Sequence, residues 1–494
     1  MASDACMAFW PQRALGMVLG VTAIAALSGC ADFSGIASAS RTVDAQTMGL
    51  ANPTLSAPQD STLPADTWWQ TFGDAQLNRL VDQALADSPS LRVAQARLAR
   101  AQAGSDNADA AGKPQVNGSL DMSRQRFTAL GIYPPPIGGS VLNLATLQAS
   151  ASWEWDFFGK NRAALEAAVG QVRAAQADAE AARLLLASQV AHSYFQWARW
   201  QQQTALQEAV LDQRTQLRTL VQDRVHAGLD TALELQQADS ALAEARLQRE
   251  VLREQGSLSL QALAAWIGKP NSTPALDLPG PYAIKIIAID VPLPINLLGR
   301  RADVRAALWR VEAARSEVDA AQKQFYPNIN LTAFAGFSSV GFDRLLQNGS
   351  DQWGVGPAVR LPLFDQGHLR AALKGRTADF DAAVESYNAL VIDAVHDARD
   401  QWTSVQAIAR QHAEQALALA HAEAGYEIAL ARYRAGLGNN LAVLAAQAPV
   451  LAQRRQITDL AARALDAQVQ LMRAMGGSLS ADLPTSPLLK QSAP

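Results

Sequence analysis

The feature that most constrains the fold is an internal duplication, because the second half of the chain repeats the first at a nearly constant offset. The hexapeptide RVHAGL at 224–229 returns 208 residues later as RYRAGL at 432–437. The stretch PQVN at 114–117 returns 213 residues later as PNIN at 327–330. A shared bias toward alanine would not align proline and glycine in the same order. We therefore expect two copies of one structural unit.

Each copy has the same expected plan. A helix (about 74–110, then about 300–324) leads into a strand that begins at the shared proline, and a loop and a second strand follow. A very long helix comes next (about 160–223, then about 368–433), followed by a Gly-Leu break and another long helix. Each of the first long helices would measure about 100 Å at about 1.5 Å per residue. Helices of that length need lateral packing against neighbours, as in a coiled coil.

The four expected strands alternate between apolar residues and polar or small ones. Val116 and Leu120 face one way while Asn117 and Asp121 face the other, and aromatic residues lie near the strand ends. This alternation is typical of an outer-membrane β-barrel with lipid outside and water inside. A half-buried soluble sheet shows the same pattern, so the alternation alone leaves both possibilities open.

Four strands cannot close a barrel, and an open sheet edge in lipid leaves backbone groups unpaired. If the strands cross a membrane, several chains must contribute to one barrel: two chains would give eight strands, three twelve and four sixteen. An eight-stranded barrel is filled by its own side chains, whereas twelve or more strands could leave a water-filled lumen. The loops 129–140 and 338–351 would be the exposed tips.

The N-terminus carries an expected export signal. An apolar run from Ala14 to Leu27 is too short to span a bilayer stably, and it ends in the tetrapeptide LSGC at 27–30. This tetrapeptide resembles the lipobox of bacterial lipoproteins, which predicts cleavage before Cys30 and lipid attachment to its thiol. The alternative is an ordinary signal peptide with a chance cysteine. Ala31 follows the cysteine, and by resemblance to bacterial sorting signals this favours the outer membrane.

Composition excludes several classes of function. The chain has two cysteines, and Cys6 would be removed with the signal, so neither a disulfide nor a cysteine-based metal site is expected in the mature protein. A net charge of -4 argues against nucleic acid as a partner. No histidine spacing indicates a metal site, and we find no phosphate-binding glycine loop or nucleophile–base pair. We therefore expect no cofactor and no enzymatic activity.

A set of motifs resembles the TolC-like outer-membrane efflux protein family, specifically its lipid-anchored OprM/NodT-type branch. The resemblance runs from about residue 66 to about residue 477. The matching motifs are DTWW at 66–69, WEWDFFGK at 153–160, RRAD at 300–303, LPLFDQG at 361–367 and the two RxxAGL breaks.

This resemblance implies a mainly α fold with a small β part. It implies a homotrimer with a twelve-stranded outer-membrane β-barrel, continued by a periplasmic α-helical barrel and an equatorial collar. The implied function is the exit channel of a tripartite efflux system that passes drugs or other small molecules outward. Its partners would be outer-membrane lipid, a periplasmic adapter (membrane fusion) protein and an inner-membrane pump of RND, MFS or ABC type. The exit component of a protein-secretion (type I) system and a non-pore periplasmic coiled-coil lipoprotein remain alternatives.

By the same resemblance, the two helix breaks are the periplasmic tips that contact the adapter. The expected contact residues are Arg224, Gly228, Leu229, Arg432, Gly436 and Leu437. Leu441 could form an apolar constriction at the periplasmic gate, and Asp230 could add a weak cation-attracting ring. Ala445 and Ala448 stand where family members often have an acidic residue and an arginine, so a charged gate is not expected there. Pro449 should kink its helix or mark a local break.

These inferences divide the chain into six expected parts. They are a lipoprotein signal peptide (1–29), a lipidated segment with part of the collar (30–73), the first repeat (74–268), an equatorial connector (269–299), the second repeat (300–476) and a C-terminal tail (477–494).

Overall fold

The computed structural model describes residues 33–43, 67–271, 274–277, 299–362 and 364–477. The described chain is mostly helical with one small sheet, and it forms two compact units. Unit 1 comprises the sheet and the helical segments next to it (98–175 and 307–387, with the N-terminal stretch up to 42). Unit 2 comprises 43–97, 176–306 and 388–494. The signal peptide, Cys30, most of the 269–299 connector and nearly all of the C-terminal tail lie outside the described residues.

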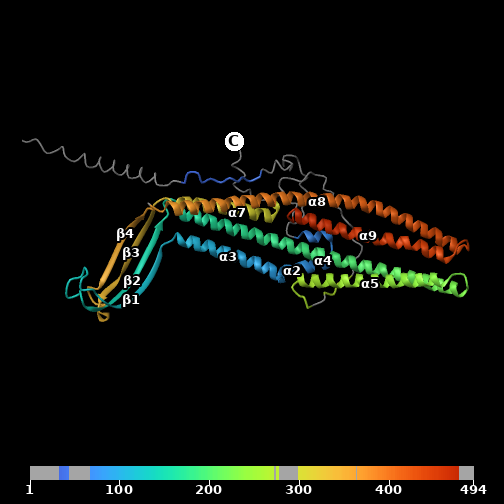
Figure 1. Ribbon diagram of the computed structural model, residues 1–494, viewed down its shortest axis with the longest axis horizontal. Helices are drawn as coiled ribbons and strands as arrows, with labels where there is room; N and C mark the ends of the chain where they lie inside the picture. The colour runs from blue at the N-terminus through green and yellow to red at the C-terminus, as the bar shows by residue number, and fades with distance from the viewer. Residues whose placement is uncertain (1–32, 44–66, 272–273, 278–298, 363, 478–494) are drawn as a thin grey trace, which may run out of the picture. The chain divides into compact units, whose positions relative to one another are not determined.

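The duplication is confirmed, because the same order of elements occurs twice (Figure 1). The first copy is α3 (Pro89–Ala111), β1 (Gln115–Arg126), β2 (Val141–Trp155), α4 (Lys160–His226) and α5 (Ala232–Trp266). The second copy is α7 (Ala302–Lys323), β3 (Asn328–Val340), β4 (Asp351–Arg360), α8 (Gln366–Arg434) and α9 (Asn440–Ala474), with a short 3-10 helix η3 (Phe342–Arg344) between its strands.

The helix expected over 74–110 is in fact two helices, α2 (Ala75–Asp87) and α3. Asp74 caps α2 by accepting hydrogen bonds from the backbone of Gln76 and Leu77. Ser88 is extended, with φ -66° and ψ 127°, because the ring of the following Pro89 disfavours the helical conformation there. Proline is well tolerated in the first turn of the next helix.

The four strands form one antiparallel sheet in the order β1-β2-β3-β4, which leaves β1 and β4 as free edges (Figure 1). The register places Val116 opposite Ala151, Ala151 opposite Ala333 and Ala333 opposite Val355. Residues directly opposite each other point to the same face, so the apolar residues of all four strands share one face as expected.

The other face holds one aromatic ring among polar and small residues, and Leu142, Leu144 and Val340 lie at its loop end. Phe334 lies opposite Gly354 on the neighbouring strand. A Cβ atom at Gly354 would come within 2.6 Å of the Phe334 ring, so the glycine makes room for it. The sequence pattern of this face did not single out Phe334.

Helix α4 approaches α7 closely within unit 1. A Cβ atom added at Gly170 would lie 2.9 Å from the Cβ of Ala313, and the guanidinium of Arg173 lies 4.5 Å from the ring centre of Trp309. The N-terminal stretch packs here too, since Phe33 meets Phe325 edge-on at 5.9 Å and Ser38 donates a hydrogen bond to Asp381. Small residues at Gly170 and Ala313 thus allow the two helices to pack closely.

The main core of unit 2 brings a short aromatic segment against three long helices. Trp68 and Trp69 of the 3-10 helix η2 (Trp68–Phe72) are buried together with Leu77 of α2. The core residues from the long helices are Leu186, Val190, Tyr194 and Phe195 of α4, Leu263 of α5, and Leu465, Val469 and Met472 of α9. The DTWW motif therefore marks a packing site.

The expected break at Pro449 is absent, because α9 runs through it from Asn440 to Ala474. Val450 and Leu451 next to the proline are buried, at 4% and 6% exposure. We attribute the continuity to this packing, which offsets the hydrogen bond that proline cannot donate. None of the helices in the described ranges combines the length and the sustained apolar character of a membrane-crossing helix.

Candidate functional site

The first candidate tip is the turn between α4 and α5. Gly228 has φ +72°, and the turn is closed by hydrogen bonds from the backbone N–H of Gly228 to Val225 (3.0 Å) and from Leu229 to Arg224 (2.9 Å). Thr231 then caps α5 in a reciprocal arrangement with Glu234. No atom lies within 4 Å of a Cβ placed at Gly228, so the left-handed backbone, and not crowding, requires glycine there.

The second candidate tip, between α8 and α9, repeats this geometry. Gly436 also has φ +72°, and its N–H donates to Tyr433 (3.0 Å) while that of Leu437 donates to Arg432 (2.8 Å). Asn439 caps α9 by accepting from the backbone of Ala442. The two RxxAGL motifs therefore encode the same helix-ending turn.

Each tip carries a leucine whose side chain is exposed and lies outside the hydrophobic core. Leu229 is 66% exposed and Leu437 is 71% exposed. Leu233 lies one turn further along α5 and is 63% exposed. Each tip thus combines a hydrogen-bonded turn and a capped helix start with exposed apolar side chains, which suits contact with another protein.

The two tips differ in charge. Arg224 makes a two-pronged ion pair with Asp230, with both nitrogen–oxygen distances at 2.8 Å, and its hydrogen bond lowers the pKa of the Asp230 carboxyl. The repeat places Gly438 at the position of Asp230, and within the described parts of the chain Arg432 has no ion-pair partner. The ion pair with Arg224 therefore offsets the negative charge of Asp230, which was expected to form a cation-attracting ring. Within the described residues no carboxylate offsets the charge of Arg432 in this way.

The expected gate residue Leu441 lies in the first turn of α9 and is 37% exposed. Its neighbours Val443 and Leu444 are buried, and Gln213 of α4 donates a hydrogen bond to the carbonyl oxygen of Leu444 (2.6 Å). Leu441 is thus the exposed leucine of that turn, next to a segment of α9 that is hydrogen-bonded to α4.

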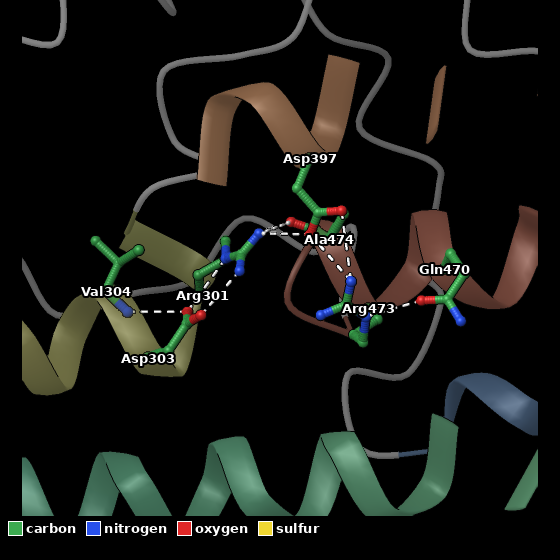
Figure 2. A network of polar contacts seen from close by, with 7 residues as sticks. All are labelled: Arg301, Asp303, Val304, Asp397, Gln470, Arg473 and Ala474. Carbon is green, nitrogen blue, oxygen red and sulfur yellow. Dashed lines mark hydrogen bonds and ion pairs between the residues drawn. The ribbon is translucent and has the colours of Figure 1, made fainter. Parts of the chain in front are cut away.

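A network of charged residues joins α7, α8 and α9 in unit 2, and Figure 2 shows its members (Arg301, Asp303, Asp397, Arg473 and their backbone partners). Arg301, whose side chain is 10% exposed, pairs with both oxygens of Asp303 at 3.1 and 2.8 Å and reaches Asp397 at 3.3 Å. It also donates to the carbonyl oxygen of Ala474 near the end of α9 (3.4 Å). Arg473 binds Asp397 from the other side at 3.2 Å.

Sequence reasoning noted the RRAD motif but missed this network, because Asp397 and Arg473 lie far from the motif along the chain. Burial is the largest influence on Asp303 and opposes its ionisation, but the hydrogen bond and charge of Arg301, together with backbone hydrogen bonds, outweigh it and lower the pKa of the carboxyl. Asp303 therefore stays ionised, and the network cross-links three helix segments.

A second charged contact, between His192 of α4 and Asp466 of α9, was also missed. The hydrogen bond to Asp466 raises the pKa of His192 above its ordinary value. Of the residues that the structure describes, no three His, Cys, Asp or Glu side chains cluster in a way that could hold a metal ion.

Comparison with known proteins agrees with this architecture. The chain matches the profile of the outer membrane efflux protein family over residues 80–269 and 293–477. It is 33% identical over 449 residues to the putative multidrug resistance outer membrane protein MdtQ of Escherichia coli (strain K12), covering 87% of this chain and 93% of MdtQ. It is 31% identical over 430 residues to multidrug resistance outer membrane protein MdtP of E. coli O6:H1, covering 85% and 87%.

Among solved structures, the outer membrane protein VceC of Vibrio cholerae superposes with a TM-score of 0.76 at 33% identity. The match covers 85% of this chain and all of VceC. The chain therefore belongs to the outer membrane efflux protein family. As a member, it is the outer-membrane component of an efflux system, and the family resemblance inferred from the motifs is confirmed.

Proposed function

We propose that three copies of this chain form a passive exit channel that carries small molecules from a periplasmic adapter and an inner-membrane pump to the cell exterior. The single observation that carries the proposal is the sheet, which exposes an apolar face and has two unpaired edges. On that face Trp353 is 76% exposed, Val116 70% and Val355 67%. A sheet face of this kind in water would promote aggregation, but it suits contact with lipid.

The unpaired edges require further strands. β1 and β4 each present a row of backbone groups that lipid cannot satisfy, at a cost of several kcal/mol for each group. Pairing β4 of one copy with β1 of the next satisfies both edges. Three copies give twelve strands, which leave a lumen lined by the polar face.

The two tips are the proposed contacts with the adapter. Arg224, Gly228 and Leu229 would form one contact, and their repeat counterparts Arg432, Gly436 and Leu437 the other. Leu441 would narrow the periplasmic mouth by its apolar side chain, and Asp230 would contribute residual negative charge beside it. The pump would be of RND, MFS or ABC type, and energy would come from it because the channel performs no chemistry.

Drugs are the proposed cargo, since the relatives MdtQ and MdtP are named for multidrug resistance. Deleting the gene should raise the accumulation of a fluorescent drug several-fold, and the plasmid-borne gene should restore efflux. Unchanged drug accumulation together with loss of a secreted protein would instead support the type I secretion alternative.

Lipid on Cys30 is proposed to aid delivery and insertion, because twelve strands would hold the channel in the membrane without it. Cys30→Ala should slow the appearance of trimers in a pulse-chase experiment and leave drug efflux largely intact. Trimers that form at the normal rate in this variant would contradict the proposed role.

A further inference from the structure

The apolar face of the sheet changes character at its loop end, at the end opposite to the helices. One row of directly opposed residues on this face is Leu120, Leu147 and Phe337. Two residues further along β1, Met122 lies opposite Ala145, and beyond it Arg124 lies opposite Asn143. Arg126, the last residue of β1, lies opposite Val141. Two arginines therefore follow directly after the apolar rows and point to the same face.

The length of the apolar rows fits one membrane thickness. From Trp155 to Ala145, β2 covers roughly ten residues, about 33 Å at about 3.3 Å per residue. Strands tilted by about 40° would reduce this to about 25 Å, the height of the apolar band of outer-membrane barrels. Trp155 lies beside the start of α4, so the aromatic end is the helix end. Arg124 and Arg126 then lie just beyond the opposite border of the band.

Both guanidinium groups are free to bind a ligand. Arg124 and Arg126 are exposed, and within the described residues neither has a hydrogen-bond or ion-pair partner. Asp121 points to the other face. On their own face of the strands the nearest carboxylate is Asp351 on β4, in the row of Leu120. It lies three strands across (about 14 Å at about 4.8 Å per strand) and four residues along the strand direction from Arg124 (about 13 Å at about 3.3 Å per residue). Within the described residues the pair is thus positive charge that no carboxylate ion-pairs with, although Asp343 of η3 lies at the same end, since the N–H of Gly341 donates to the carbonyl oxygen of Asn143 opposite Arg124.

We propose that Arg124 and Arg126 bind the phosphate groups of an anionic lipid headgroup in the outer leaflet, namely the bisphosphorylated lipid A headgroup. A guanidinium binds phosphate through two parallel hydrogen bonds, and its stem can lie along acyl chains while the charge reaches the headgroup layer. The acyl chains would lie against Leu120, Met122 and Leu147. This site rests on the proposed function, because that function puts the loop end of the sheet at the cell exterior.

One other occupant is compatible with the geometry. In the proposed trimer β4 of a neighbouring copy lies beside β1, so the neighbour's edge strand brings an aspartate at 351 to the loop end of the same barrel wall. A lipid is favoured because β4 offers one carboxylate for two arginines.

Native mass spectrometry of the purified full-length protein tests the site with bisphosphorylated lipid A as the probe. The wild type should retain lipid A, and R124Q/R126Q should bind it at least about tenfold more weakly, because two charge-assisted hydrogen-bonding groups are lost. The matched control R97Q/R100Q removes two exposed arginines from α3 and should bind as the wild type does. R124K/R126K keeps the charge but not the two-pronged geometry and should be intermediate.

Further measurements distinguish lipid A binding from binding of free phosphate and from a contact between copies of the chain. Dephosphorylated lipid A should not bind, and inorganic phosphate at millimolar concentration should not displace the bound lipid. Equal lipid A binding by R124Q/R126Q and the wild type would overturn the proposal. So would equal trimer loss in R124Q/R126Q and D351N, which would assign the arginines to a contact between copies. Trimer content and conductance are measured on the same samples. A wild type that binds lipid A without trimers or conductance would refute the proposed function and leave the lipid site standing.

Discussion

Arg301 pairs with two carboxylates from different helices of unit 2, and its role is structural. Its guanidinium satisfies two carboxylates and a helix-end carbonyl oxygen at once, with a side chain that is 10% exposed (Figure 2). Removing it would leave Asp303 and Asp397 without their shared partner in a partly buried position. Breaking a buried pair from one side is costly because the remaining charge loses compensation.

We therefore expect Arg301→Gln to destabilise the protein by about 2–3 kcal/mol, below the range for fully buried pairs because both carboxylates keep some exposure. Thermal dissociation of the trimer followed on gels measures this. Arg305→Gln on the same helix removes a more exposed pair with Glu180 and should cost less than about 1 kcal/mol. Equal midpoints for the two variants would show that the network adds no stability.

His192 makes stability depend on pH. Its folded pKa lies above the ordinary value of about 6.5, so its contribution is fully present below that pH and is lost as pH rises through the folded pKa. The pair is partly exposed, so the effect should stay below about 1 kcal/mol. Between pH 6 and 9 the dissociation midpoint should fall more steeply in the wild type than in His192→Gln. Parallel curves would exclude His192 as the source.

At the scale of the elements, two glycines inside helices should respond to alanine in opposite ways. Gly170 of α4 lies against Ala313, where a Cβ would come within 2.9 Å, whereas nothing lies within 4 Å of a Cβ at Gly104 of α3. Gly170→Ala should destabilise by about 1–3 kcal/mol through overpacking. Gly104→Ala should stabilise by about 0.5–1 kcal/mol, because alanine favours the helix. Thermal unfolding of both variants checks this, and a stabilising Gly170→Ala would refute the close approach.

The tips should bind the adapter through their exposed leucines. Replacing Leu229 and Leu437 by aspartate would put charge into the proposed apolar contact and should weaken adapter binding at least about tenfold, since desolvating an unpaired charge is costly. Surface plasmon resonance with immobilised adapter measures this. Leu130→Asp, in a loop at the sheet, changes a fully exposed leucine and should have no effect. Undiminished binding by the double variant would move the contact elsewhere.

Elements with a local signal were predictable from sequence. The strands follow from alternation, the turns from glycine with its capping residues, and the second copy from the first. The division of α2 from α3 was readable at Pro89 but was not predicted. The pair of Arg224 with Asp230 had a signal, since the two residues are close in sequence and only one repeat carries the aspartate. The partners of Arg301 and His192 come from distant helices, so only tertiary packing determines them.

At the scale of the whole molecule, three facts belong together. The chain belongs to the outer membrane efflux protein family, its sheet has an exposed apolar face, and that sheet cannot satisfy its edges alone. Closure by three copies explains why a single chain exposes so much apolar surface on four strands. The same closure would form a lumen lined by the polar face of the sheet.

The most direct test of this account is conductance in planar bilayers by the purified, detergent-extracted protein. We predict discrete single-channel steps from the full-length protein, together with a heat-stable trimer on gels. A matched variant that places charge on the lipid face, Val355→Arg, should insert less often, because arginine at the bilayer midplane costs about 2–4 kcal/mol. A folded wild type that stays monomeric and produces no conductance steps would contradict the account.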